Sequence, residues 1–242
     1  MRIVAILAGG LGTRLGPQTA NCPKALVDVA GKPFVVRQLE LLRKQGVDRV
    51  VLCIGHFGER IRECVGDGSK FGLEVVYSDD GSRLLGTAGA LRQALPMLGP
   101  RFFVLYGDSY LCVDLAAVEA GFTVGSRPAL MTVLRNDGLW DKSNVVFADG
   151  ELLEYDKHHS HAKMRHIDYG LSLFSAEVFD ACMPGEPIDL ADLFHDLARQ
   201  GQLTGYEVFQ RFYEIGSLTG LHETIEYFND GMKSELRKAI FE

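Results

Sequence analysis

A run of six apolar residues, Ile3 to Ala8, ends abruptly at a glycine-rich turn. A continuous apolar run of this length is typical of a strand buried on both faces of a parallel sheet. Gly9, Gly10 and Gly12 can adopt positive φ, and without a Cβ they let the backbone lie directly against a ligand. The bare N–H groups of such a loop form a concavity that suits phosphate or the edge of a base. The stretch therefore predicts an α/β fold with an anion-binding turn after its first strand.

Two cationic residues follow the glycines in the same segment. Arg14 offers a planar guanidinium for phosphate oxygens, and Lys24, which follows Pro23, is a point charge. The buried strand, the glycine turn and the two cations together predict a site for a polyphosphate.

Two common glycine-loop motifs are excluded. The Walker pattern needs Gly-Lys-Ser/Thr at the start of a helix, and no such tripeptide follows Gly12. The dinucleotide fingerprint needs a third small residue where this chain has Leu15, and a helix that starts inside the glycines. Pro17 and the polar residues from Gln18 to Cys22 instead predict a long loop.

The stretch from Gly9 to Phe34, GGLGTRLGPQTANCPKALVDVAGKPF, resembles the signature of the sugar-1-phosphate nucleotidyltransferases, G-G-x-G-T-R-L-x-P followed by P-K-x-L. The resemblance implies a Rossmann-like α/β fold of the GT-A type, with a mixed, mainly parallel sheet flanked by helices and a small sugar-binding insertion. It also implies Mg²⁺-dependent transfer of a nucleotidyl group from a nucleoside triphosphate to a sugar 1-phosphate. The nucleotide would contact Leu7, Ala8, Gly9, Gly10, Gly12, Thr13, Gly86, Thr87 and Gly107.

Length and composition fit one well-buried domain. The chain has 242 residues, of which 47% are hydrophobic and 24% charged. We expect a single domain over residues 1–242, with a nucleotide-binding half at about 1–110 and a sugar-phosphate-binding half at about 111–242. No internal repeat or linker interrupts it.

Charge and cysteine usage exclude several classes. The formal net charge of -7 argues against a nucleic-acid binder, which needs a basic face. The five cysteines are scattered and form no CxxC motif, which favours a reducing compartment over a disulfide framework or a zinc site. No stretch is long enough to span a bilayer, and the N-terminal apolar run is too short for a signal peptide. We expect a cytoplasmic protein without a membrane partner, and the closing helix could build a homodimer.

Apolar runs and helical periodicity alternate along the chain. Strands are expected at 3–8, 50–54, 73–77 and 102–106, and helices at 34–45, 57–65 and from Gly86 to Leu95. This alternation implies parallel strands joined by helical crossovers. Further strands are expected at 129–135, 144–147, 152–155, 167–174, 203–207 and 211–215, with 167–174 able to run antiparallel. The last helices are expected at 189–200 and from about 218 to 237.

Asp108 is the sharpest single candidate for chemistry. It follows an apolar strand, at the end of the strand where open α/β sheets bind ligands. A carboxylate that faces a triphosphate there is a natural Mg²⁺ ligand. The alternative is an Asp that caps the next helix or turn. The family resemblance favours the metal ligand.

Gly86-Thr87-Ala88-Gly89 is similar to the GTAG of mannose-1-phosphate guanylyltransferases, where Thr87 and the nearby backbone would read the base edge. The structural alternative is that Thr87 caps the following helix. Both can hold, because a helix N-terminus also binds anions and carbonyls.

Several residues of the second half match the family's sugar site. Asp156-Lys157 resembles its acid–lysine pair, in which the lysine holds the sugar phosphate and the acid meets a sugar hydroxyl. Asn144, Tyr169 and Gly170 would line the same pocket, glycine because it lets a hexose approach the backbone. Without the resemblance, a lone lysine at a strand end is usually just a solvated side chain.

Glu214, in Phe212 to Ser217, stands where the family has an Asp that is the second metal ligand. One extra methylene moves the carboxylate by more than about an ångström, and Mg²⁺ tolerates poor octahedral geometry badly. Glu214 would therefore bind the metal through a water or through a shifted backbone.

Two further features remain open. His158, His159, His161 and His166 could bind a transition metal, but a solvated loop over the sugar site is the favoured interpretation. Trp140, the only tryptophan, could stack on a sugar or cover the edge of the core.

The implied chemistry is attack of a sugar 1-phosphate on the α-phosphorus of the triphosphate. The second pKa of a phosphate monoester is about 6, so no general base is required. Arg14, Lys24, Asp108 and Lys157 would be the catalytic residues, with Mg²⁺ on Asp108 and Glu214.

The resemblance specifies the reaction better than the substrates. GTAG favours GTP and a mannose- or manno-heptose-type 1-phosphate. The alternatives are a uridylyltransferase for N-acetylmuramate or glucose phosphate and a non-catalytic regulatory homologue. A related glycosyltransferase would be expected to carry DxD, and Asp108-Ser109-Tyr110 lacks the second Asp.

Overall fold

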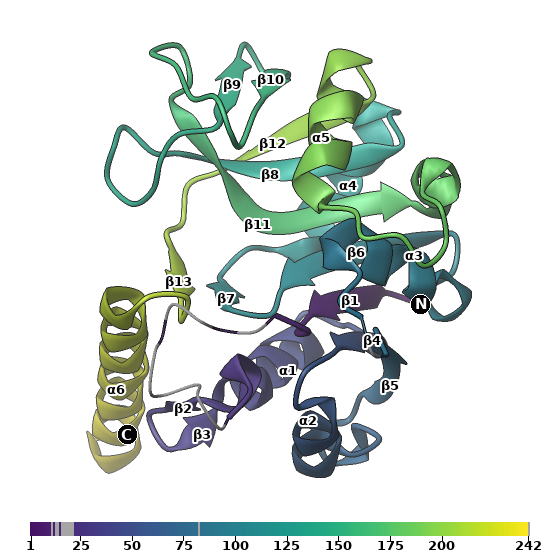
Figure 1. Ribbon diagram of the computed structural model, residues 1–242. Helices are drawn as coiled ribbons and strands as arrows, with labels where there is room; N and C mark the ends of the chain where they lie inside the picture. The colour runs from purple at the N-terminus through teal and green to yellow at the C-terminus, as the bar shows by residue number, and fades with distance from the viewer. Residues whose placement is uncertain (11, 13–14, 16–21, 82, 242) are drawn as a thin grey trace.

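The computed structural model describes residues 1–10, 12, 15, 22–81 and 83–241, and it describes side chains as far as residue 231. Four parallel strands form one half of a nine-stranded sheet (Figure 1). β1 (Ile3–Leu7) lies between β4 (Arg49–Ile54) and β6 (Arg101–Tyr106), and β5 (Glu74–Asp79) lies beyond β4. The crossovers contain α1 (Phe34–Lys44), α2 (Gly58–Val65) and α3 (Gly86–Leu98). The predicted parallel arrangement is confirmed.

The second half continues the same sheet with mixed pairing. β11 (His166–Ser175) pairs antiparallel with β6, as the sequence suggested, and antiparallel with β8 (Ala129–Arg135). β12 (Leu203–Val208) runs parallel to β8, and the hairpin of β9 (Val145–Ala148) and β10 (Glu151–Tyr155) joins the start of β11. α4 (Leu115–Gly125) and α5 (Leu190–Arg199) pack against this half. The two predicted halves therefore share one sheet.

Short elements complete the fold. β2 (Asp28–Val29) pairs with β3 (Lys32–Pro33), and β7 (Ser109–Leu111) pairs antiparallel with β13 (Phe212–Glu214). Short 3-10 helices occur at Lys24–Leu26, Ser69–Phe71 and Ala176–Ala181. The β7–β13 pair matters for the site, because Glu214 lies opposite Ser109 and so beside Asp108.

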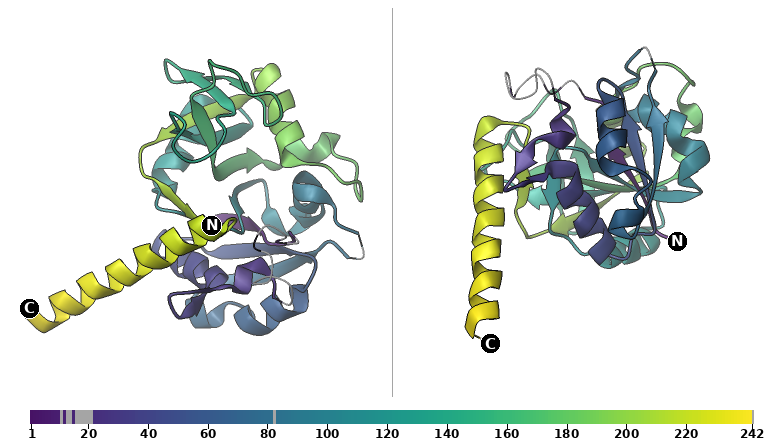
Figure 2. Two further views of the ribbon diagram at one scale, coloured as in Figure 1. Left: turned by 60° about the vertical axis from the view of Figure 1, so that its left-hand side comes forward. Right: turned by 90° about the horizontal axis from the view of Figure 1, so that it is seen from below.

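α6 (Leu218–Phe241) is the longest helix and extends beyond the body of the molecule (Figure 2). Within the described part of the chain, no helix has the length and apolar character that crossing a membrane would require.

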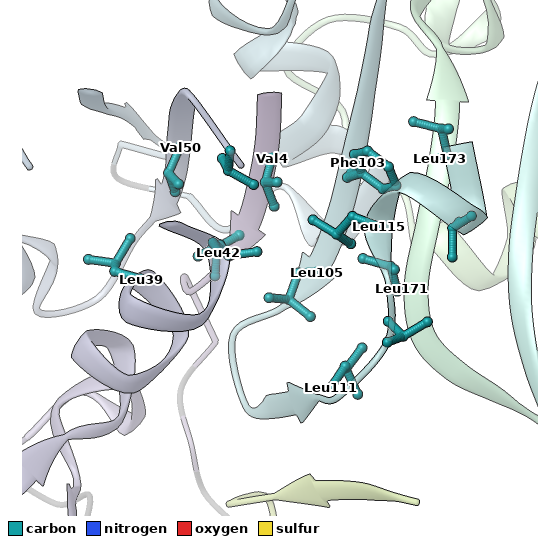
Figure 3. Close-up of a cluster of buried hydrophobic side chains, with 14 of the residues drawn as sticks. Val4, Leu39, Leu42, Val50, Phe103, Leu105, Leu111, Leu115, Leu171 and Leu173 are labelled. Atoms are coloured by element: carbon teal, nitrogen blue, oxygen red, sulfur yellow. The ribbon is translucent and has the colours of Figure 1, made fainter. Parts of the chain in front are cut away.

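The apolar core lies in two layers, one on each face of the sheet. Successive strand side chains point to opposite faces. Val4 and Ile6 therefore pack with Leu39 of α1 and with the residues of β6, β11 and α4 that Figure 3 shows. Ala5 and Val51 face the other way, against α3 and α5.

A smaller cluster fixes the elements around the glycine turn. Leu15 and Val29 are buried with Phe34, Ile215 and Leu221. This cluster joins the start of α1 to the start of α6. It therefore holds Leu15 next to the β13 strand that carries Glu214.

Candidate active site

The carboxyl ends of β1, β4 and β6 border a cavity of about 470 Å³. This is the edge of a parallel sheet at which ligands are expected. Every predicted nucleotide-binding residue that the structure describes lines this cavity: Leu7, Ala8, Gly9, Gly10, Gly12, Gly86, Thr87 and Gly107. Thr13 and Arg14 lie outside the described residues.

Two positions in the cavity require glycine, because another segment of backbone lies close to each of them. A Cβ on Gly107 would lie 2.5 Å from the carbonyl oxygen of Leu7, to which the Gly107 N–H donates a hydrogen bond of 3.0 Å. A Cβ on Gly9 would lie 3.3 Å from the amide nitrogen of Gly55. At the floor of the cavity, backbone therefore packs directly on backbone. A side chain at Gly107 would force the ends of β1 and β6 apart.

Lys24 and Asp108 meet at one end of the cavity. The Lys24 Nζ donates to Asp108 Oδ2 at 2.8 Å, and the two side chains are 15% and 28% exposed. The next helix, α4, is capped by Asp114, so the helix-capping alternative for Asp108 is wrong. The Asp108 carboxylate faces Lys24, and its backbone oxygen accepts the N–H of Ile215 at 2.9 Å.

A buried amide fixes the turn that carries Asp108. Gln38 of α1 is 1% exposed, and its Nε2 donates to the carbonyl oxygens of Tyr106 at 3.1 Å and Ser109 at 2.8 Å. These carbonyls flank Asp108 on either side. Asp108 is thus held by a rigid helix rather than by a free loop.

Glu214 lies close to this pair but faces its own turn. Its carboxylate accepts hydrogen bonds from the Gly216 N–H, the Ser217 N–H at 3.1 Å and the Ser217 hydroxyl at 2.6 Å. A Cβ on Gly216 would lie 2.6 Å from Glu214 Oε2, 3.2 Å from Asp108 Oδ2 and 3.3 Å from Lys24 Nζ. The carboxylates of Glu214 and Asp108 and the ammonium of Lys24 therefore surround the space that a side chain at Gly216 would occupy.

Replacement of Gly216 by alanine is expected to lower kcat at least about tenfold, because the new methyl group must displace Glu214 or Lys24 from this position. Gly231→Ala, on α6, is the control, since nothing lies within 4 Å of a Cβ there. Rates of pyrophosphate release and thermal unfolding curves of both variants check the prediction. Equal rates for the two variants would contradict it.

A chain of three side chains connects the cavity to the second half of the site. Thr87 Oγ1 accepts the N–H of Leu190 at 2.6 Å and donates to Asp189 Oδ1 at 3.0 Å. The other oxygen of Asp189 accepts from Lys157 Nζ at 3.1 Å. Thr87 therefore accepts the first N–H of α5, whose N-cap is Asp189. It does not cap α3, as the structural alternative supposed, because Leu85 is the N-cap of α3.

Lys157 is the lysine predicted to hold the sugar phosphate. The residues predicted beside it, Asn144 and Asp156, accept hydrogen bonds from nearby backbone N–H groups. Asn144 Oδ1 accepts the N–H of Asp168 at 3.0 Å. Asp156 Oδ1 accepts the N–H groups of His159 at 2.8 Å and His158 at 2.7 Å. The backbone hydrogen bond from His159 is the main reason that the pKa of Asp156 falls to about 2. Asp156 is therefore ionised and fixes the turn after Lys157.

Tyr169 does not line this pocket with its side chain, which corrects the sequence-based expectation. The residue is 2% exposed and its ring packs edge-on against Phe212 in the core. Strand alternation is the reason, because Asp168 and Gly170 take the opposite face of β11. Gly170 does lie toward the site, with φ of 101°, and a Cβ there would lie 3.4 Å from both Ser109 Oγ and the ring of Tyr106.

Three carboxylates of the site were missed from the sequence. Asp80 lines the nucleotide cavity, and burial raises its pKa. Asp189 forms the chain described above. Asp168 is held inside β11, and burial raises its pKa to about 6. A charged residue inside the apolar run IDYGLSLF was the signal for Asp168.

The histidine-rich segment makes local contacts with carboxylates. His159 contacts Asp156 and His161 contacts Glu154, both on the surface, whereas His166 is 7% exposed within β11. No three metal-ligating side chains converge anywhere in the described residues. His166 therefore does not belong to the predicted loop.

Trp140 lies on an ordered turn at the edge of the core. Asn136 accepts the N–H of Trp140 at 3.1 Å and donates to Ser143 Oγ at 2.9 Å. The indole packs edge-on against Phe212 with ring centroids 6.1 Å apart. Of the two sequence-based interpretations, the cover over the core edge describes this contact.

Comparison with known proteins gives the family. The family model described as nucleotidyl transferase matches residues 3–134. The chain belongs to the nucleotidyl transferase family. The match spans the glycine turn, the GTAG turn and Asp108, which are the residues that line the cavity.

Relatives in the family differ in nucleotide and sugar. The chain is 32% identical over 213 residues to the UTP–glucose-1-phosphate uridylyltransferase of Synechocystis, covering 81% of this chain and 55% of that one. It is 30% identical over 224 residues to the N-acetylmuramate α-1-phosphate uridylyltransferase of Neisseria meningitidis, covering 90% and 94%. It is also 30% identical to the D-glycero-α-D-manno-heptose 1-phosphate guanylyltransferase of Campylobacter jejuni, covering 72% and 76%. The chain thus spans about half the length of some of its relatives and nearly all of others.

Solved structures of the family share the fold. A Bacillus anthracis protein solved in complex with sucrose superposes with a TM-score of 0.83 at 22% identity, covering 94% of this chain and 95% of that one. The HddC protein of Yersinia pseudotuberculosis in complex with GMP-PN gives 0.78 at 24% identity, covering 94% and 100%. These identities establish the fold of this family member and leave its substrates open.

Proposed function

We propose that this protein transfers a nucleotidyl group from a nucleoside triphosphate to a sugar 1-phosphate and releases pyrophosphate. One observation carries the proposal. The glycine turn, the GTAG turn and the Lys24–Asp108 pair line one cavity, and Thr87 on its wall connects through Asp189 to Lys157. The cavity would accommodate the base and phosphates of the nucleotide, and Lys157 would bind the sugar phosphate.

The reaction is a substitution at phosphorus. An oxygen of the sugar phosphate forms a bond to the α-phosphorus, and the bond from that phosphorus to the bridging oxygen of the β-phosphate breaks. The attacking phosphate is largely ionised at neutral pH, so no side chain has to remove a proton. The protein's task is to position two anions and to reduce their repulsion.

Three cationic side chains would each bind a different phosphate. Lys24 lies in the cavity and would hold the α-phosphate, and Lys157 would hold the attacking phosphate. Arg14 would hold the departing β- and γ-phosphates. Lys24 is held by Asp108 and is largely buried, so its ammonium is oriented before substrate arrives, whereas the half-exposed Lys157 contacts Asp189 and can turn to the sugar phosphate. Pre-oriented charge stabilises a transition state at little reorganisation cost.

Asp108 and Glu214 fit a divalent cation. Members of the family generally use a divalent metal. Both carboxylates border the position left open at Gly216, and they offer the hard oxygen ligands that Mg²⁺ prefers. We propose Mg²⁺ with Asp108 as its main protein ligand, and phosphate oxygens and water as the other ligands. When bound, it would neutralise charge on the reacting phosphates.

Asp80 supports GTP as the nucleotide. Its carboxylate lies on the cavity wall, where a Cβ on Gly9 would be 3.5 Å from Asp80 Oδ2, and it accepts a long 3.4 Å hydrogen bond from the Leu85 N–H. A carboxylate is an acceptor only. Guanine presents two neighbouring donors, N1–H and N2–H₂, whereas uracil and thymine present one donor between two carbonyls. Asp80 therefore matches guanine and repels the carbonyls of a pyrimidine.

Asp80→Asn is expected to lower kcat/KM for GTP about ten- to a hundredfold, since hydrogen bonds to charged groups contribute about 1.5–3 kcal/mol. Activity with UTP should stay equal or rise, because the repulsion disappears. Pyrophosphate release with each triphosphate measures the ratio. If GTP and UTP lost activity in the same proportion, Asp80 would have no part in base selection.

The sugar is proposed to be of the mannose or manno-heptose type, on the GTAG resemblance and the Campylobacter relative. The Neisseria relative supports the second candidate, a uridylyltransferase for N-acetylmuramate phosphate. A matrix of four triphosphates against a set of sugar 1-phosphates, followed by pyrophosphate release, tests both. No release from any pair would leave the non-catalytic nucleotide-sugar-binding homologue.

A further inference from the structure

Asp168 is a carboxylate held inside the central sheet. It lies on β11 opposite Val133 of β8, and its neighbours Ile167 and Tyr169 face the opposite, apolar layer. The β11–β8 register shifts between Asp168 and Ser172, where Gly170 has φ of 101°. Such irregularities re-aim side chains next to active sites. Asp168 therefore faces the side of the sheet that carries Tyr106 and Lys157.

The hydrogen-bonding capacity of Asp168 is only partly used. Oδ1 accepts the N–H of Gly170 at 2.9 Å, and Oδ2 accepts the Tyr106 hydroxyl at 3.4 Å, which is long for an O–H···O bond. Lys157 exerts an attractive charge on Asp168, but its ammonium contacts Asp189 instead. Oδ2 can therefore accept a stronger donor.

Nothing about packing requires a charge at this position. Burial raises the pKa of Asp168 to about 6, so its ionised form is less stable here than in water. An asparagine would keep the Gly170 hydrogen bond without that cost. Charged groups held against their own solvation are characteristic of functional sites.

We propose that Asp168 accepts a hydroxyl of the sugar and excludes sugar 1-phosphates that carry a second acidic group. Tyr106 lines the nucleotide cavity, so a sugar whose phosphate meets Lys157 has its ring beside Asp168. Asp156 and Asp189 add two more carboxylates around Lys157. The phosphate is neutralised by the cations, whereas a carboxylate elsewhere on the sugar would face these acids. The substrate class is then a neutral hexose or heptose, which rests on the proposed function and disfavours N-acetylmuramate.

Two substrate pairs test this inference: glucose 1-phosphate against glucuronic acid 1-phosphate, and N-acetylglucosamine 1-phosphate against N-acetylmuramate 1-phosphate. The wild-type protein is expected to prefer the neutral member of at least one pair on the order of a hundredfold in kcat/KM, as for like charges a few ångströms apart. Asp168→Asn should reduce that ratio at least about tenfold and leave the KM for the triphosphate unchanged. Asp192→Asn, which removes an exposed charge on α5, should leave the ratio unchanged.

Calorimetric binding of the same sugar phosphates, with a non-hydrolysable GTP analogue present, separates the two proposals. A neutral-over-acidic preference that Asp168→Asn abolishes supports the role of Asp168 even if no turnover is seen and the proposed function fails. Equal treatment of neutral and acidic sugars by the wild-type protein would overturn it. So would an Asp168→Asn variant that keeps the wild-type ratio.

Discussion

Alanine in place of Asp108 is expected to lower kcat at least about a hundredfold, the scale on which single electrostatic groups contribute to catalysis. Two losses combine. The site loses the carboxylate proposed to hold the divalent cation, and Lys24 loses the partner that fixes its ammonium at 2.8 Å. KM should change little, because both groups act mainly on the reacting phosphates. Initial rates over a range of Mg²⁺ concentrations measure the effect.

The fold should survive this change. Gln38 holds the turn through the backbone carbonyls of Tyr106 and Ser109, and neither contact involves the Asp108 side chain. Asp149→Asn, on the exposed turn between β9 and β10, is the control for loss of one negative charge. An Asp108→Ala variant with wild-type rate and wild-type metal dependence would show that the cation binds elsewhere.

Lys157→Ala is expected to raise the KM for the sugar 1-phosphate about ten- to a hundredfold, with a smaller change in kcat. The ammonium is half-exposed and contacts Asp189 at 3.1 Å, so it can turn to an arriving phosphate. Charge-assisted hydrogen bonds of this kind are about twice as strong as neutral ones. The KM for the triphosphate should stay unchanged, because Lys157 does not line the nucleotide cavity.

Lys163→Ala controls for loss of a positive charge in the same segment, because Lys163 is exposed. Steady-state kinetics with each substrate varied in turn give both KM values. If the KM for the triphosphate rose as much as the KM for the sugar phosphate in Lys157→Ala, the proposal that Lys157 binds the sugar phosphate specifically would be wrong.

The nucleotide end of the site was predictable because it depends on local sequence. A buried strand followed by glycines fixes where a turn lies, and parallel strands bring their carboxyl ends to one edge. Gly86 and Gly107 were placed in one pocket with Gly9 by the family resemblance, although the three are far apart along the chain, whereas Gly9 itself follows from this rule. Asp108 followed from the same rule.

The sugar end depends on contacts that sequence spacing does not encode. Thr87 bonds Asp189, which lies 102 residues away, and the pairing of β7 with β13 brings Glu214 beside Asp108. The side on which Tyr169 points follows from strand register, which the sequence left open. Asp168 was missed because it lies inside a run of apolar residues, and such a run predicts a buried strand rather than a binding residue.

α4 was missed for a different reason. Its sequence, LAAVEAGFTVG, is small and apolar on most sides, so the contrast between a polar and an apolar face is weak. The usable signal was Asp114, whose carboxylate accepts the N–H groups of Ala116 at 2.8 Å and Ala117 at 3.4 Å as an N-cap. Capping residues thus carry information where periodicity fails.

A crystal structure of the protein with a non-hydrolysable GTP analogue and Mn²⁺, located by its anomalous signal, tests the central claim most directly. The account predicts the phosphates against the glycine turn at Gly9, Gly10 and Gly12, with the ion bound to Asp108. A nucleotide bound away from this turn, with no ion in contact with Asp108, would contradict it.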